Sequence, residues 1–294
     1  MTISASDVKL LREKTGAGMM ACKEALNTTN GDLEAAVDYL RKKGLAAAQK
    51  KQSRTAADGS VVNASSGNTS VLLEVNCETD FVGKGDDFKC FARDMAKFAA
   101  ENSISDIESL KEAKLEAVNE LTLKCGEKID LRRLLTVNSD NAFGHYNHGG
   151  KIGVLVEAKI SSASSETEEL LKDLAMHVAA ASPKFLDATG IDEDFKAREA
   201  KIYREQLKEQ GKPEKMIPQI IEGKLRKLAS EVCFLEQPFV KNPDINVKSH
   251  VAEVAKASGS EISILGFHTL KLGEGVEKKV DNLADEVAKM TQQQ

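Results

Sequence analysis

A stretch of strand-like sequence followed by helix-like sequence occurs twice in the chain, about 80 residues apart. Residues 71–75 (VLLEV) resemble residues 154–158 (VLVEA), and residues 92–96 (ARDMA) resemble residues 171–175 (LKDLA). Solenoid repeats are about 20 to 50 residues long, so a longer period indicates a duplicated domain instead. The repeat therefore predicts an α+β fold that uses one strand-then-helix unit twice.

The residues before the first copy have the pattern of a small helical module. Apolar residues recur at helical spacing in 6–54, with a TGAG break at 15–18, a second helix over 19–26 and a third opened by Asn-Gly-Asp at 30–32. Basic residues outnumber acidic ones in this segment, and a solvated face is sufficient to explain that excess. We therefore predict a separate three-helix head.

From residue 58 the apolar period changes to two, which is typical of strands. Residues 60–64 and 69–76 flank a Ser-Ser-Gly-Asn turn and predict a hairpin with one apolar face. Further along, the pattern predicts helices over 88–100 and 107–125 and strands over 130–138 and 151–160, the last after a glycine-rich turn.

A charge-dense region follows the second copy. Between 192 and 230, two helical patterns flank Gly-Lys-Pro at 211–213, which predicts a helical hairpin in the form of an antiparallel coiled coil. Alternation returns over 262–270, and a short helix is expected over 280–290.

Charge and composition disfavour several classes of protein. The net charge of −5 and a pI near 5.7 lack the basic footprint that would make nucleic acid the default partner, so we expect no direct nucleic-acid binding, although charge alone does not exclude it. No apolar run approaches 18 residues and residues 1–11 do not resemble a signal peptide, so we expect a cytoplasmic protein without membrane contact. The five cysteines include no CxxC pair, and we expect buried free thiols and no disulfide framework.

A search for catalytic or cofactor-binding motifs finds little. The phosphate-binding motifs GxxxxGK[ST] and GxGxxG are absent, so we expect no nucleotide held by this chain itself. His145 and His148 form the only close histidine pair, but they lack a third ligand and fall in the glycine-rich turn, so we expect no metal site. His177 is replaced by Phe98 in the other copy, and we interpret it as a core residue.

Residues 76–85 (NCETDFVGKG) remain unexplained by these patterns. They follow a strand, place Phe81 beside an acid, and continue into glycines. Phe81 either folds back into the core or is presented at a turn as an interface anchor, and the residues alone leave both readings open.

Several blocks of the sequence together resemble the bacterial elongation factor Ts family, the guanine nucleotide exchange factors of elongation factor Tu. The blocks span nearly the whole chain, and Gly150 is a mild departure from the family's His-Gly-small-Arg/Lys-Ile-Gly pattern. They are LREKTGAGMM at 11–20 with CK at 22–23 and AL at 25–26, NC at 76–77, TDFV at 79–82, HG at 148–149 with KIGVLV at 151–156, MHVAA at 176–180, and QPFV at 237–240.

The resemblance implies a particular domain organisation. It implies a UBA-like three-helix head over 1–54 and a duplicated core over 55–140 and 141–280. It also implies a protruding coiled-coil hairpin inserted at about 190–230 and a C-terminal helical module over 281–294. These divisions agree with those drawn above from periodicity.

The resemblance also implies a partner and a set of contact residues. It implies that the chain binds elongation factor Tu and promotes GDP release, that only the partner holds nucleotide, and that the chain is not an enzyme and has no cofactor. The segment Thr79, Asp80, Phe81 and Val82 would dislodge the partner's Mg²⁺, while Met19, Met20, His148 and Gly149 would make other contacts with the partner. One carboxylate cannot supply the octahedral shell of Mg²⁺, so we expect Asp80 to fix the loop or pair with a cation of the partner.

Two other functions are compatible with parts of the sequence. One is an adaptor for a ubiquitin-like modifier or the ribosome, built around the helical head, with the core as a scaffold. The other, with little support, is an enzyme that uses His148 and Cys125. Acceleration of GDP release from elongation factor Tu distinguishes all three.

Overall fold

The architecture comes from a computed structural model that describes residues 3–276, with all their side chains except those of 47 and 48. This part of the chain forms a mixed α+β fold of eleven α-helices and three small sheets, with strand orders β1-β2-β3, β4-β5-β8 and β6-β7. It divides into two compact units, one of residues 3–66, 73–137 and 271–276, and one of residues 67–72 and 138–270. The expected α+β class is confirmed.

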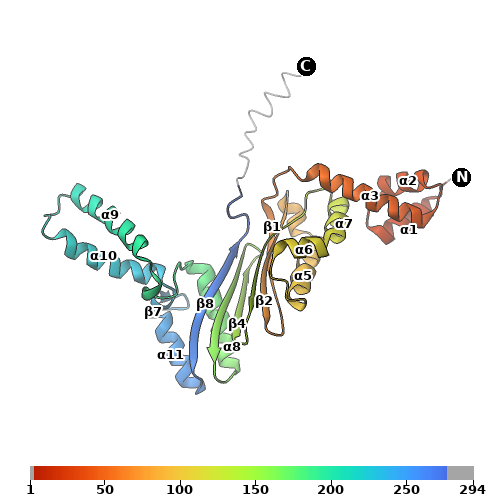
Figure 1. The fold of residues 1–294 in the computed structure, drawn as a ribbon. Coiled ribbons are helices and arrows are strands. Elements are labelled where there is room, and N and C mark those ends of the chain that lie inside the picture. The colour runs from red at the N-terminus through yellow and green to blue at the C-terminus, as the bar shows by residue number, and fades with distance from the viewer. Residues whose placement is uncertain (1–2, 277–294) are drawn as a thin grey trace. The chain divides into compact units, whose positions relative to one another are not determined.

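Three helices open the first unit, as the head's periodicity predicts (Figure 1): α1 (Ala5–Thr15), α2 (Met19–Thr28) and α3 (Leu33–Lys51). Ser4 caps α1 in a reciprocal capping box, and Asp32 caps α3 by accepting two backbone N–H groups. The fully buried Leu11, Leu26 and Leu40 anchor a small shared core. Helix breaks and caps close in sequence therefore determine this part of the fold.

The first sheet consists of β1 (Asp58–Ser66), β2 (Thr69–Cys77) and β3 (Asp130–Asn138). The predicted hairpin is confirmed, because β1 and β2 are neighbours in the sheet on either side of a two-residue turn at 67–68. Its single apolar face is wrong, since β2 is buried at all nine positions. Even Glu74 is fully buried, because both of its oxygens accept hydrogen bonds from Arg132 Nη1 at 3.0 Å and it also binds Arg133 Nε. A buried carboxylate needs such partners, since they offset the free-energy cost of removing its charge from water.

Helices α5 (Asp86–Glu101), α6 (Ile107–Ala113) and α7 (Leu115–Cys125) follow β2 in the first unit. We predicted one helix over 107–125, but the chain breaks at Lys114, whose φ of −119° and ψ of 16° lie outside the helical region. The Lys114 ammonium lies 3.4 Å from the centre of the Phe98 ring, a cation–π contact that accompanies the break.

The sheet of the second unit contains β4 (Ala142–His148), β5 (Ile152–Ile160) and β8 (Ile262–Lys271), with β4 antiparallel to β5. We placed His145 and His148 in a turn, but both lie on β4, and only the two glycines and the lysine after His148 form the turn. Glycine, histidine and asparagine disfavour a strand by composition, and pairing with the buried β5 outweighs that preference.

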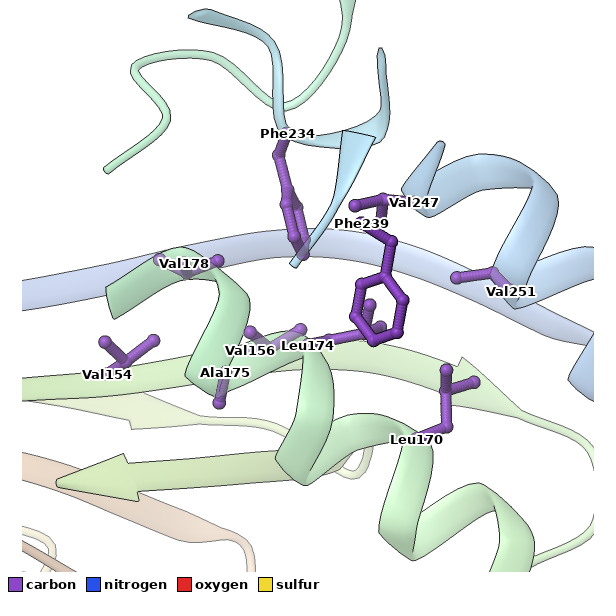
Figure 2. Packing of buried hydrophobic residues seen from close by; sticks show 10 residues of the cluster. All are labelled: Val154, Val156, Leu170, Leu174, Ala175, Val178, Phe234, Phe239, Val247 and Val251. Carbon is purple, nitrogen blue, oxygen red and sulfur yellow. The ribbon is translucent and has the colours of Figure 1, made fainter. Parts of the chain in front are cut away.

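Helix α8 (Ser165–Ala181) covers this sheet together with α11 (Val247–Ser258) and Phe239 of the short strand β6 (Pro238–Phe239), which pairs with β7 (Asn242–Asn246). Figure 2 shows Phe234 and Phe239 pointing toward the apolar side chains of α8 and β5. Sequence periodicity did not predict α11, β6 or β7. Val247, Val251 and Val254 of α11 do recur at helical spacing, so this helix was predictable from the sequence, whereas β6 and β7 are too short to show a period.

Helices α9 (Glu193–Glu209) and α10 (Ile217–Val232) run antiparallel as neighbours (Figure 1). They share a small buried cluster of Leu207, Ile217 and Ile221. The helix predicted over 280–290 and the module over 281–294 lie outside the described residues.

The cysteines do not all behave as expected. All five are free, as predicted, but Cys90 is exposed, so the expectation that every thiol is buried is wrong. Within residues 3–276 no helix is long and apolar enough to cross a membrane. No group of three or more His, Cys, Asp or Glu in the same residues could hold a metal ion.

His177 is a buried core residue, as the sequence predicts, and it contacts the Gln237–Val240 segment. The Val240 N–H donates to His177 Nδ1 at 3.1 Å, so the ring proton lies on Nε2 and donates to Gln237 Oε1 at 2.9 Å. The ring also stacks on Phe234. Burial lowers the pKa of His177 below its ordinary value, because the charged imidazolium would be desolvated and would place a second N–H against Val240.

This arrangement predicts a pH dependence of stability in the second unit. Below about pH 6.5, His177 of the unfolded chain binds a proton that the buried His177 of the folded chain does not. The free energy of unfolding of this region should therefore decrease as the pH decreases toward 5. Hydrogen–deuterium exchange of residues 170–181, corrected for the intrinsic rate, measures this. Burial also lowers the pKa of His145, so His177→Phe should make the dependence shallower without abolishing it. An equally steep dependence in His177→Phe would contradict the prediction.

Candidate functional site

The segment predicted to act on the partner forms a short helix directly after the buried strand β2. Thr79 is the N-cap of α4 (Asp80–Lys84), and its hydroxyl accepts a hydrogen bond from the Val82 N–H at 3.5 Å. Asp80 pairs with Lys84 at 2.6 Å within the helix, and this pairing raises the pKa of Lys84. Phe81 is 85% exposed, so it does not fold back into the core.

The base of α4 is packed tightly against the first sheet. A Cβ on Gly83 would lie 3.1 Å from Gly59 Cα and 3.3 Å from the Cys77 sulfur, so a side chain here would push these neighbours apart by a few tenths of an ångström. The Cys77 thiol donates to the Thr79 carbonyl at 3.1 Å, and burial raises its pKa to about 12, which keeps the thiol protonated as a donor. The helix that carries Phe81 is therefore held against a buried strand.

A second anchor for this segment comes from Glu127, which the sequence analysis missed. Its Oε2 accepts from the backbone N–H groups of Glu78 and Thr79 at 3.1 and 3.0 Å, and its Oε1 accepts from the Thr79 hydroxyl at 2.6 Å. Nothing in the local sequence indicates this contact, because 48 positions separate Glu127 from Thr79.

Met19 and Met20 begin α2 in the same unit, and both are exposed, Met20 at 76%. Gly18 precedes them without a side-chain cap, and α2 has no acidic residue in its first turn. The methionines therefore lie at a helix N-terminus, apart from the head's core, where flexible side chains adapt to irregular surfaces.

His148 and Gly149 lie in the second unit, at the turn between β4 and β5. The exposed His148 shares a hydrogen bond with the Tyr146 hydroxyl through Nδ1 at 3.1 Å. The turn closes when the Lys151 N–H donates to the His148 carbonyl at 2.9 Å and the Gly150 N–H donates to the Asn147 side chain at 2.7 Å. His148 is thus presented to solvent on a constrained turn.

The environments of His148 and Cys125 do not suit catalysis. His148 is paired with a tyrosine, and burial raises the pKa of Cys125, whereas a nucleophilic cysteine needs a lowered one. In the first unit, Asp80, Phe81 and Val82 lie on α4 after the Thr79 cap, and Met19 and Met20 lie on α2. An exposed aromatic on a fixed support suits protein recognition.

Comparison with known proteins identifies the family. A family model described as "Elongation factor TS" matches residues 78–274. The chain is 44% identical over 302 residues to an elongation factor Ts of Magnetococcus marinus, which covers 99% of this chain and 100% of that protein. It is 44% identical to the Clostridium acetobutylicum protein, covering 99% of each chain, and 45% identical to that of Clostridioides difficile, covering 98% of each. The chain therefore belongs to the elongation factor Ts family, whose members are nucleotide exchange factors for elongation factor Tu in translation elongation and not catalytic enzymes.

Proposed function

We propose that this chain drives GDP release through Phe81, which inserts into elongation factor Tu and disturbs the elements that hold its Mg²⁺. The observation that carries the proposal is the 85% exposure of Phe81 on a helix anchored to a buried strand. A large aromatic left in water costs free energy that contact with a partner would recover. Because α4 is held against the sheet, contact with Phe81 would displace elements of the partner instead of displacing α4 itself.

The energetics of exchange need no contact with the nucleotide base. Suppose that this chain binds nucleotide-free elongation factor Tu more tightly than nucleotide-bound elongation factor Tu. Because the coupling is reciprocal, its binding lowers the affinity of elongation factor Tu for nucleotide by the same ratio. Loss of Mg²⁺ removes the main neutralisation of the phosphates, so displacement of the ion is an efficient route to that coupling. In this proposal Asp80 holds α4 through Lys84 and is not a ligand of the metal.

The other contacts extend over both units. We propose that Met19 and Met20 attach the head to the partner, and that His148 and Gly149 act on the phosphate-binding side of elongation factor Tu. Their exposure and the constrained turn after His148 support these roles.

The finer organisation of the chain is part of the same proposal. We propose that residues 1–54 form a UBA-like head and that 55–140 and 141–280 are two copies of one ancestral unit. The strand-and-helix pairs β2 with α5 and β5 with α8 support the duplication. The helical pair at about 190–230 would be a coiled coil, supported by the apolar cluster between α9 and α10.

Phe81→Ala tests directly whether Phe81 inserts into elongation factor Tu as a wedge. GDP release from elongation factor Tu should slow by roughly 10-fold or more, since an interface anchor contributes about 2 kcal/mol and each tenfold is about 1.4 kcal/mol. The melting temperature should change by only a few degrees, because the side chain is exposed. Leu265→Ala, which truncates another exposed residue on β8, should leave release unchanged. A large loss of stability with normal exchange would refute the wedge.

The Mg²⁺ dependence tests the mechanism separately. In excess EDTA the partner has already lost the ion, so the defect of Phe81→Ala should shrink. Stimulated GDP release is measured for both proteins at millimolar Mg²⁺ and again in EDTA. If the ratio of the two rates stays constant, Phe81 supplies only general binding energy, and metal displacement is wrong while the family assignment stands.

Met20→Glu tests the head. A carboxylate near the N-terminus of α2 is favourable for the helix, so circular dichroism should show no loss of helix, while affinity for elongation factor Tu should decrease roughly 10-fold. The matched control Ala5→Glu adds the same charge at the start of α1 and should bind normally. Unchanged affinity in Met20→Glu would remove Met20 from the interface.

A further inference from the structure

Glu127 is the one side chain described above that reaches the Thr79–Val82 segment from a distant element and that the proposed mechanism does not use. Its carboxylate accepts three hydrogen bonds, two from the backbone N–H groups of Glu78 and Thr79 and one from the Thr79 hydroxyl at 2.6 Å. Hydrogen bonds to a charged acceptor are roughly twice as strong as neutral ones. Removal of Glu127 would leave these donors without their partner.

The geometry of α4 makes this contact matter for Phe81. Helix α4 has only five residues, and an isolated helix of that length is not stable in water. Its orientation therefore depends on its cap, Thr79, and on the groups that hold the cap. Glu127 binds both the backbone and the hydroxyl of Thr79, two positions before Phe81.

Glu127 is itself held at a fixed point. Helix α7 ends at Cys125 and is capped by Gly126, whose φ of +76° turns the chain sharply in a conformation that favours glycine. The next residue, Lys128, donates its backbone N–H to the Glu78 carboxylate at 2.7 Å, and its ammonium donates to the carbonyls of Gln52 and Arg54. The carboxylate that holds Thr79 therefore extends from a backbone that is tied on both sides.

We propose that Glu127 is a positioning residue for exchange, which sets the orientation of Phe81 by holding Thr79 and does not itself need to touch the partner. This inference rests on the proposed function of Phe81. It differs from that proposal in locating part of the exchange activity at a residue 46 positions away in sequence.

The test compares three variants in stimulated GDP release at millimolar Mg²⁺. Glu127→Ala should slow release by roughly 3- to 10-fold, the range expected for the loss of a helix cap, and no more than Phe81→Ala does. Glu127→Gln should recover most of the rate, because its amide oxygen can still accept from the two N–H groups. Asp106→Ala is the matched control, since Asp106 caps α6 by accepting from the Ser109 N–H and hydroxyl at 2.8 and 2.7 Å, and it should leave release unchanged.

A double-mutant cycle separates positioning from a general structural effect. If Glu127 acts through Phe81, adding Glu127→Ala to Phe81→Ala should slow release no further. An equal loss in both backgrounds, or an equal loss in Asp106→Ala, would overturn the inference.

Amide hydrogen exchange in the free protein gives a readout that does not depend on the partner. In Glu127→Ala the amides of Glu78, Thr79 and Val82 should exchange faster, while in Asp106→Ala they should not. If Phe81→Ala leaves GDP release normal, the proposed function of Phe81 fails, and unchanged amide exchange in Glu127→Ala would refute the positioning role on its own.

Discussion

The first unit depends on one buried carboxylate. Glu74 lies in the middle of the fully buried β2 and binds Arg132 and Arg133 of β3, and its Oε1 also accepts the Gly273 N–H at 2.8 Å. Arg133 in turn donates to the Lys271 carbonyl at 2.6 Å. One charge thus joins two strands and the segment that follows β8. Because a buried carboxylate is costly when any partner is lost, removing one of these partners should destabilise both strands.

The sequence predicted the features that depend on near neighbours. The TGAG break before Met19 and the strand over 130–138 follow from local caps and from alternation, and both agree with the structure. Glu74 shows the limit. The predicted hairpin with one apolar face gives no reason to bury Glu74, and only arginines 58 and 59 positions later reveal why it can be buried.

The candidate site also combines features that depend on residues close in sequence with features that depend on distant ones. The TDFV motif and the exposed methionines could be selected from sequence by resemblance, and periodicity alone left Phe81 undecided between core and surface. The position of α4, which presents Phe81, depends on Gly83 packing against Gly59. The Thr79 cap of this helix is held by Glu127. Pairings between distant elements leave no period in the sequence, so only the fold reveals them.

If Phe81 contacts elongation factor Tu as proposed, the close packing of α4 against the first sheet has a consequence for how the free protein meets this partner. Because Gly83 already packs against Gly59 and Thr79 already caps α4, the helix that carries Phe81 is formed before any encounter. Association then loses little further conformational entropy at this point, and no folding step precedes docking. The association rate at the proposed Phe81 contact would therefore depend on how often the two proteins collide in a productive orientation, and not on prior folding of α4.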